Sequence, residues 1–252
     1  MKSVFRQVQT LFPGLHNVRF DLKFWQMRLN GQPHEPDFAA LADFEFSTEE
    51  VALDVGANRG EAHWSMRLFL PQGMEIHSFE PNPLVAKLLQ DRVEGWPRAR
   101  VHSYGLGATA DERSLYVPYY RKWMFDGLAS FDPKEAGSWL QSRLWGYRSR
   151  LFRMEAVSCR QEMLDALEFP AGIIKLDVQG WEHEVLKGGW QTIKKHLPVL
   201  MIEDLPRALI PQLEALDYDL WYWERGIWKS GRSDINTFAV PKHRWKQGKA
   251  PF

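Results

Sequence analysis

The residues best suited to chemistry in this chain are carboxylic acids at the ends of short apolar segments, namely Asp54, Glu80, Asp177 and Glu203. A turn with glycines at Gly56 and Gly60 follows the first of them, and Glu80 lies 20 residues beyond Gly60. Glycine-rich turns at the carboxyl end of a parallel strand bind nucleotides in doubly wound folds, and an acid at this distance can accept hydrogen bonds from a ribose. The spacing therefore predicts a nucleotide site.

The composition of the turn indicates the kind of nucleotide. A dinucleotide site brings three glycines close to a pyrophosphate, whereas Asn58 stands here in place of the second glycine. The carboxylate of Asp54 repels a pyrophosphate but attracts a cationic ligand with an amino group. S-adenosylmethionine fits, because it has a sulfonium, an α-amino group and a ribose diol. The alternative is that Asp54 only caps the turn.

Several segments together resemble one known family. They are Asp54, Gly56-Ala-Asn58 and Gly60; Phe79-Glu-Pro81; Ile174-Lys-Leu-Asp177 with Gly180, Glu182 and Gly188; and Glu203. In this order they resemble the FkbM-type family of S-adenosylmethionine-dependent methyltransferases over roughly residues 50–240. The resemblance implies S-adenosylmethionine as cofactor, bound by Asp54, Gly56, Asn58, Gly60, Glu80, Pro81, Asn82 and Leu106.

Two positions depart from the family pattern. Gln179 stands where the family usually has an acid, and Ser103-Tyr-Gly-Leu-Gly107 stands where an asparagine usually follows the third strand. If that acid is catalytic in relatives, its absence makes a catalytically inactive, cofactor-binding protein the alternative.

Methyl transfer to a hydroxyl requires removal of a proton by a base or a metal. Asp177 is the first candidate because it ends the predicted central strand, where ligands bind in such folds. Lys175 lies on the same strand face and can pair with Asp177, the alternative being a purely structural ion pair. Glu203 is a candidate second base, and His183 a candidate one turn into the next helix. Carboxylates at adjacent strand ends can bind magnesium, but no compact ligand motif is present, so no metal is predicted.

Alternating strand and helix patterns position these residues. We expect strands at 51–55, 74–80, 99–104, 173–178, 199–204, about 218–224 and about 234–240, and helices at 60–70, 83–93, 159–167, 181–196 and 206–216. This succession predicts an α/β fold with a Rossmann-like, doubly wound, mostly parallel seven-stranded sheet. The linker from Gly226 to Asp234 is too short for a crossover helix, so the C-terminal hairpin adds an antiparallel strand.

The predicted domains are an N-terminal helical leader at 1–46 and a methyltransferase domain at 47–252, with an insertion at about 105–158. Residues 113–120 are expected to form a strand at the sheet edge, and residues 121–150 to cover the acceptor site. Aromatic walls for the acceptor are expected from Trp123, Phe125, Trp139 and Trp145, and cations for an acidic carrier from Arg121, Arg143 and Arg148. The alternative is that these aromatics only pack the insertion onto the sheet.

Length and charge limit the partners. A chain of 252 residues with 32 basic and 32 acidic side chains has no net charge to attract nucleic acid. The single Cys159 fits a reducing compartment, and with no predicted signal peptide or transmembrane segment we expect a cytoplasmic protein. Val4, Val8, Leu11 and Phe12 share a helical face that either packs on the domain or makes peripheral membrane contact. The oligomeric state is not predicted.

The resemblance implies O-methylation of a hydroxyl on a sugar, glycan, lipid-linked or secondary-metabolite acceptor. A less favoured alternative is an NAD(P)-dependent oxidoreductase, against which Asp54 and the missing glycine argue.

Overall fold

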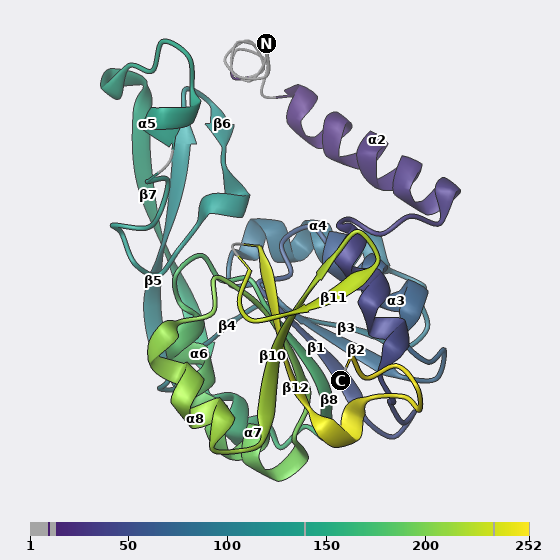
Figure 1. Ribbon diagram of the computed structural model, residues 1–252. Helices are drawn as coiled ribbons and strands as arrows, with labels where there is room; N and C mark the ends of the chain where they lie inside the picture. Colours follow the sequence, from purple (N-terminus) through teal and green to yellow (C-terminus); the bar gives the residue numbers. More distant parts are fainter. Residues whose placement is uncertain (1–9, 11–13, 139, 234, 252) are drawn as a thin grey trace.

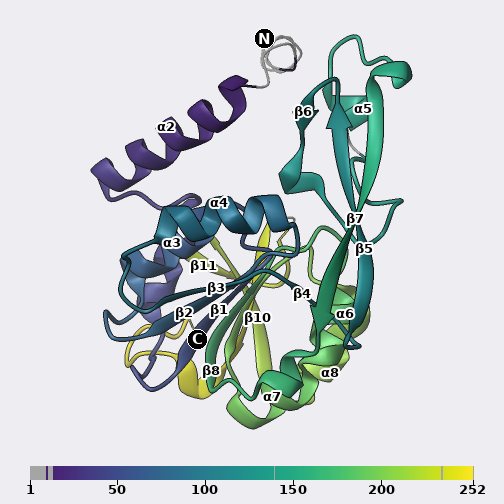
Figure 2. The same ribbon diagram turned by 180° about the vertical axis from the view of Figure 1, so that it is seen from behind.

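The computed structural model describes residues 10, 14–138, 140–233 and 235–251. They form a layered α/β domain, from which a smaller second sheet projects (Figures 1 and 2). The helix α2 (Gly14–Asn30) lies on the same side of the main sheet as this projection (Figure 1).

The main sheet has the order β11-β10-β12-β9-β8-β1-β2-β3. Its strands are β1 (Val51–Val55), β2 (Glu75–Phe79), β3 (Ala99–His102), β8 (Ala171–Leu176), β9 (Val199–Glu203), β10 (Tyr218–Glu224), β11 (Ile227–Ser230) and β12 (Asn236–Pro241). The five strands β3, β2, β1, β8 and β9 are mutually parallel, and β12 runs antiparallel to both β9 and β10. The predicted doubly wound sheet with an antiparallel C-terminal strand is therefore confirmed.

The sheet has eight strands rather than the predicted seven. The additional strand, β11, forms within the segment that was expected to be only a linker, and it pairs antiparallel with β10. Trp228 of β11 packs against Trp223, Phe44 and Phe238. A four-residue segment would not form an edge strand by itself, and the packing of Trp228 stabilises β11 at this edge.

Helices cover both faces of the sheet. On one face lie α6 (Glu182–Gly188), α7 (Trp190–His196) and α8 (Ile210–Glu214), which pack apolar residues against Leu53, Leu176 and Leu200. On the other lie the 3-10 helix η1 (Pro36–Asp43) and α3 (Glu61–Phe69), packed against Ala52 and Ile173. The helix α4 (Pro83–Val93) contacts β3. Because successive strand residues face opposite ways, Leu53 and Val55 face the first layer, whereas Asp54 faces the second.

The insertion forms the second sheet, with the order β4-β7-β5-β6. Its elements are β4 (Gly105–Leu106), β5 (Asp111–Tyr120), β6 (Trp123–Met124), η2 (Asp126–Leu128), α5 (Leu140–Arg143), η3 (Ser149–Leu151) and β7 (Phe152–Glu162). The prediction of a strand over 113–120 is correct, but its position at the edge of the main sheet is wrong, because β5 pairs with β7 along its whole length. We call the projecting part, residues 111–162, the arm.

Three predicted helices differ from the structure. The helix expected at 159–167 is wrong, because Cys159 belongs to β7 and packs with Leu115 and Val117, and only η4 (Leu164–Leu167) is helical. The helix expected at 181–196 is divided into α6 and α7 around Gly188 and Gly189. A side chain on Gly188 would meet the backbone of Gly107 at 1.9 Å. The helix expected at 206–216 is reduced to η5 (Arg207–Leu209) and α8.

The N-terminal region contributes to the main core. Phe38 and Leu41 of η1, with Phe44 after it, are buried against the sheet, so the core includes residues of the segment predicted as a leader. The proposed helical face of Val4, Val8, Leu11 and Phe12 lies outside the described residues. After β12 the chain continues through η6 (Lys242–Arg244), where Arg244 pairs with Glu50.

Candidate functional site

A cavity opens at the carboxyl edge of the parallel strands. Its wall is formed by the ends of β1, β2 and β8, by the segment around β4 and by the first turn of the insertion after β6. The lining residues are Val55, Gly56, Asn58, Phe79, Glu80, Pro81, Gly105, Leu106, Leu115, Asp126, Gly127, Ala129, Ser130, Phe131, Asp177, Val178 and Gln179. The cavity thus lies where ligands bind in doubly wound sheets.

The turn after β1 passes directly beside the end of β8. Gly56 has φ +81°, and a side chain there would meet the carbonyl oxygen of Asp177 at 1.8 Å. Asn58 has φ 46°, and its Oδ1 is buried without a hydrogen-bond partner among the described residues. Only glycine fits at position 56, which places backbone rather than side chain at the cavity wall.

Glu80 is buried beside this turn. Its two carboxylate oxygens accept hydrogen bonds from the backbone N–H groups of Asn58 and Asn82, each at 2.9 Å. Burial raises the pKa of Glu80 to about 7, although both N–H donors oppose the shift. A carboxylate has further lone pairs for ligand hydroxyls, so Glu80 can receive a diol while it holds the turn in place.

Asp54 lies on the other side of β1. It is fully buried, accepts a hydrogen bond from Ser78 Oγ at 3.4 Å, and does not belong to the cavity lining. Burial raises the pKa of Asp54 to about 6, and the nearby ammonium of Lys175 opposes this. The structure therefore places Asp54 beneath the turn, apart from the position expected for a group that contacts a ligand directly.

Asp177 lines the cavity and belongs to a compact polar cluster. Its carboxylate accepts hydrogen bonds from Lys175 Nζ at 3.1 Å and Gln179 Nε2 at 2.9 Å. Although burial alone favours the neutral acid, the ammonium of Lys175 and these hydrogen bonds hold the pKa of Asp177 below its usual range. Glu203 is hydrogen-bonded to Asp177, and burial together with this neighbour raises the pKa of Glu203 to about 9. The two shifts have opposite directions, so the environment favours the ionised form of Asp177 and the neutral form of Glu203.

Gln179 connects the two acids. Its amide donates to Asp177 and, at 3.4 Å, to Glu203 Oε2. Its backbone has φ 52°, and its carbonyl accepts a hydrogen bond from Ser130 Oγ at 2.7 Å. The neutral amide is thus a donor to two carboxyl groups, at a position where the ionised Asp177 would repel a carboxylate.

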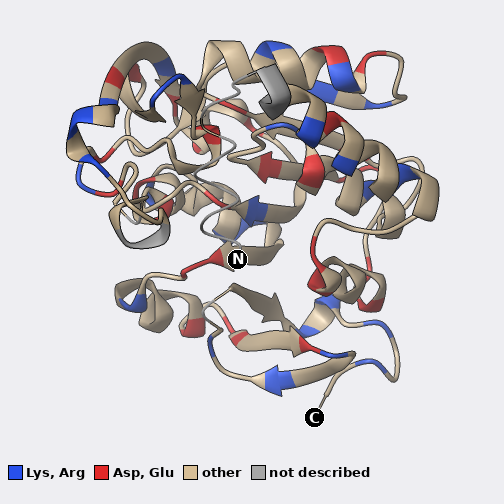
Figure 3. Cartoon of the chain, turned by 90° about the horizontal axis from the view of Figure 1, so that it is seen from above, with Lys and Arg blue, Asp and Glu red and all other residues tan. Residues whose placement is uncertain are grey.

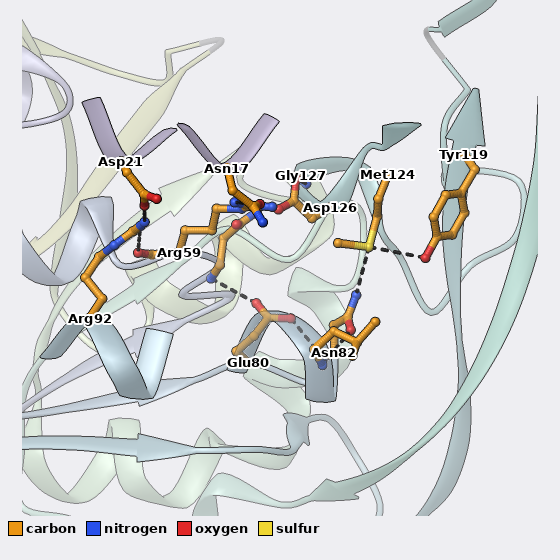
Figure 4. Close-up of polar contacts among 12 residues, drawn as sticks. Asn17, Asp21, Arg59, Glu80, Asn82, Arg92, Tyr119, Met124, Asp126 and Gly127 are labelled. Atoms are coloured by element: carbon orange, nitrogen blue, oxygen red, sulfur yellow. Dashed lines mark hydrogen bonds and ion pairs between the residues drawn. The ribbon is translucent and has the colours of Figure 1, made fainter. Parts of the chain in front are cut away.

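Contacts of Arg59 connect the turn after β1 with the insertion and with α2, as Figure 4 shows. Arg59 is buried in the turn, and its guanidinium forms an ion pair with Asp126 and donates to Asn17 Oδ1 of α2 at 2.8 Å. Its backbone carbonyl accepts a hydrogen bond from Arg92 of α4, which also pairs with Asp21 of α2. One arginine thereby joins the turn, the insertion and α2.

The described cavity lining includes only some of the residues predicted from the sequence. It contains Gly56, Asn58, Glu80, Pro81, Leu106 and Asp177, but not Asp54, Gly60, Asn82, Glu203 or His183. Gly60 precedes α3, Asn82 caps α4 by accepting from Leu84 N–H, and His183 is exposed on α6. Within the described residues no group of three or more His, Cys, Asp or Glu side chains could hold a metal ion.

The aromatic residues expected to line an acceptor site lie elsewhere. Trp123 is buried in β6, Phe125 packs in the core of the arm with Tyr120 and Leu128, and Trp145 is exposed. Trp139 lies outside the described residues, as does the side chain of Arg143. The insertion instead presents residues 126–131 to the cavity.

The sequence interpretation missed Arg59 and the contribution of residues 126–131. Arg59 stands inside the glycine turn, but its partners Asn17 and Asp126 are distant in sequence, so no spacing could reveal them. Phe131 and Ser130 lie in a stretch without periodicity, and an antiparallel bridge between Ser130 and Tyr116 of β5 holds this stretch beside the cavity.

These residues fit S-adenosylmethionine. Glu80 can accept from the ribose hydroxyls, and the unpartnered Asn58 Oδ1 can accept a further hydrogen bond. Phe79, Leu106 and Phe131 offer apolar surface to a base. Close backbone passage at Gly56 leaves the space that a nucleoside requires.

A family model described as the methyltransferase FkbM domain matches residues 54–220, and none of the curated proteins matches the chain. Among solved structures, the methyltransferase FkbM from Methylobacillus flagellatus is 18% identical with a TM-score of 0.49, the match covering 78% of this chain and 44% of that one. An rRNA methylase from Streptococcus thermophilus is 12% identical with a TM-score of 0.41, covering 84% and 98% of the two chains. This chain thus spans less than half the length of the first of these structures.

Proposed function

Because the chain belongs to the FkbM methyltransferase family, we propose that it transfers a methyl group from S-adenosylmethionine to a hydroxyl group. The acceptor we propose is a sugar, glycan, lipid-linked molecule or secondary metabolite. The observation that carries the proposal is that Glu80 and Asp177 line one cavity at the carboxyl edge of the sheet. The first is suited to hold a ribose and the second to face an acceptor.

In this proposal the turn residues bind the cofactor. Glu80 accepts from the ribose diol, Asn58 accepts a further hydrogen bond through Oδ1, and Gly56 keeps the wall free of side chains. The bound cofactor supplies an electrophilic methyl group on a sulfonium. The protein aligns the acceptor oxygen with that carbon, and such positioning accounts for a large part of the rate of methyl transfer.

Asp177 is the proposed catalytic residue. Because it is ionised at neutral pH, it accepts a hydrogen bond from the acceptor hydroxyl and orients the oxygen lone pair toward the methyl carbon. Its low pKa makes it a weak base, so the acceptor proton moves to the Asp177 carboxylate only late in the transfer, as the bond from the acceptor oxygen to the methyl carbon forms. Glu203 does not line the cavity and acts as a positioning residue that shares its proton with Asp177. His183 takes no part in the mechanism we propose.

Two measurements test this function. Calorimetry should show binding of S-adenosylmethionine and S-adenosylhomocysteine but none of NAD. Transfer of a labelled methyl group should then be measured over a panel of sugars, glycans and lipid-linked alcohols. Tight binding of NAD without binding of S-adenosylmethionine would show the proposal to be wrong and favour the oxidoreductase alternative.

Gln179 motivates the second candidate, a catalytically inactive protein that binds the cofactor. It contacts both Asp177 and Glu203 at the position where the family usually has an acid. Binding of S-adenosylhomocysteine without methyl transfer to any acceptor in the panel would favour this candidate. Methyl transfer by the wild-type chain would exclude it.

A further inference from the structure

The helix α2 is apolar on two opposite faces. Its inner face packs Phe24 and Met27 onto the domain, where Phe24 stacks on Trp96. Its outer face presents Val18, Leu22, Trp25 and Leu29, which are between 59% and 64% exposed. Their spacing of four, three and four residues aligns them along one stripe. A stripe of large apolar side chains at this level of exposure marks a contact surface.

The tip of the arm carries a second exposed aromatic residue. Trp145 is 65% exposed, although Leu140 and Leu144 beside it are buried in the core of the arm. Figures 1 and 2 show α2 and the arm extending to the same side of the main sheet. An approaching flat surface can therefore contact both, and the cavity opens at the edge of the sheet on this side.

Charge identifies the kind of surface. The helix α2 carries three exposed basic residues, Arg19, Lys23 and Arg28, and a single acid, Asp21, although the whole chain has no net charge. Asp21 is paired with Arg92. At the tip of the arm Arg148 and Arg150 are exposed, and the sequence has no acid between residues 136 and 154. Figure 3 views this side of the molecule from above with the basic residues in blue.

We propose that α2 and the tip of the arm together bind an anionic lipid bilayer. Exposed tryptophan and leucine side chains next to basic residues are the features that hold an amphipathic helix in a membrane interface. Two copies of α2 pairing through the same stripe would bring two basic segments together, which Coulomb repulsion disfavours. No helix among the described residues is long and apolar enough to cross the bilayer, so the contact is peripheral. This inference does not depend on the proposed methyl transfer, because it rests only on the exposed surfaces of α2 and of the tip of the arm.

Vesicle sedimentation with the full chain tests the proposal. Wild-type protein should bind phosphatidylcholine vesicles that contain about one quarter phosphatidylglycerol at about 0.1 M salt, and should dissociate at about 0.5 M salt. It should bind pure phosphatidylcholine vesicles much more weakly. Equal binding to both vesicle types, or no binding to either, would contradict the proposal.

Variants locate the contact. The double variant Leu22→Gln/Trp25→Gln, and separately Trp145→Gln, should each weaken binding about tenfold. Arg148→Gln/Arg150→Gln should weaken it about fivefold for each charge removed. Lys194→Gln/Lys195→Gln is the matched control, because these exposed lysines lie on α7, at the opposite end of the molecule in Figure 1. Equal effects of the two charge-removing variants would overturn the proposal.

Two further measurements distinguish membrane binding from an effect on the cofactor site and from self-association through α2. Binding of S-adenosylhomocysteine should be unchanged in the Gln variants, because none of these side chains lines the cavity. Light scattering should give a monomer for wild-type protein. If wild type is instead a dimer that Leu22→Gln/Trp25→Gln dissociates, and it does not bind vesicles, then the stripe is an interface between copies and our proposal is wrong.

Discussion

Replacement of Glu80 by glutamine tests the cofactor site most directly. The carboxylate accepts backbone hydrogen bonds from Asn58 and Asn82 at 2.9 Å each, and it lines the cavity. An amide retains one acceptor and turns its NH₂ group toward the other backbone N–H, so it disturbs the turn and loses the charge that attracts a diol. Hydrogen bonds to a charged group contribute about 1.5–3 kcal/mol each. Glu80→Gln should therefore weaken S-adenosylhomocysteine about ten- to a hundredfold at pH 8.

The raised pKa of Glu80 adds a signature that a general structural defect would not produce. The ribose hydroxyls donate hydrogen bonds, so they bind the ionised carboxylate. With a pKa of about 7, roughly a tenth of Glu80 is ionised at pH 6 and nine tenths at pH 8, and the wild-type dissociation constant should fall about tenfold between these values. The same shift affects the stability of the apo protein. Between pH 4.5, the ordinary pKa of Glu80, and about pH 7, its pKa in the folded protein, the folded state binds more protons than the unfolded state. The free energy of unfolding therefore decreases as the pH rises through this range.

The assay is calorimetric titration with S-adenosylhomocysteine at several pH values, with thermal unfolding of each apo protein. Glu80→Gln should lose the pH dependence as well as the affinity. Glu182→Gln is the matched control, because Glu182 is also buried and accepts backbone hydrogen bonds from Val178 and Gly180, but it does not line the cavity. This control should keep the tenfold change with pH. An unchanged dissociation constant in Glu80→Gln, or a wild-type constant that is the same at pH 6 and pH 8, would refute the role of Glu80.

Three further predictions follow from the site. Asp177→Asn should lower kcat at least about a hundredfold while the cofactor dissociation constant stays within about threefold, and normal turnover would leave Asp177 only a structural role. Gln179→Glu should lower the free energy of unfolding by about 1–2 kcal/mol at pH 8, with recovery on acidification, because a third carboxylate beside Asp177 has a raised pKa; a pH-independent denaturation midpoint would contradict this. Gly56→Ala should lower the free energy of unfolding by more than about 3 kcal/mol, because the new side chain would displace the backbone of Asp177. Gly95→Ala is the control and should lower it by about 1 kcal/mol, because Gly95 also has a positive φ but lies in open space. Equal melting temperatures for the two variants would contradict the packing argument.

The sequence predicted the parts of the fold that depend on local pattern. Strands such as β1 and β8 are short apolar runs that end in an acid, and the glycines after β1 mark the turn at the cavity. The edge strand β11 was not predictable, since it depends on the contacts of Trp228 with residues distant in the chain. Likewise, Cys159 lies in a stretch whose pattern is compatible with a helix, and only pairing with β5 makes it a strand.

Residues of the candidate site were predictable from the sequence where they lie directly at the end of a strand. Glu80 and Asp177 line the cavity as the strand ends suggested, but Asp54 faces the opposite layer, because side chains alternate along β1. Glu203 reaches the cavity only through Asp177. The roles of Phe131, Ser130 and Asp126 arise from the folding of the insertion, for which no spacing in the sequence gives a signal.

Arg59 connects the cavity with α2, so binding at one of these places can affect binding at the other. Its backbone lies in the turn at the cavity, and its guanidinium contacts α2 and the insertion. If contact of α2 with an external surface shifts this arginine, the affinity of the cavity for its ligand changes by some factor. Thermodynamic linkage then requires that the ligand change the affinity of α2 for that surface by the same factor. Measuring how the surface changes the affinity for the ligand therefore also gives how the ligand changes the affinity for the surface. Both measurements yield the same coupling free energy.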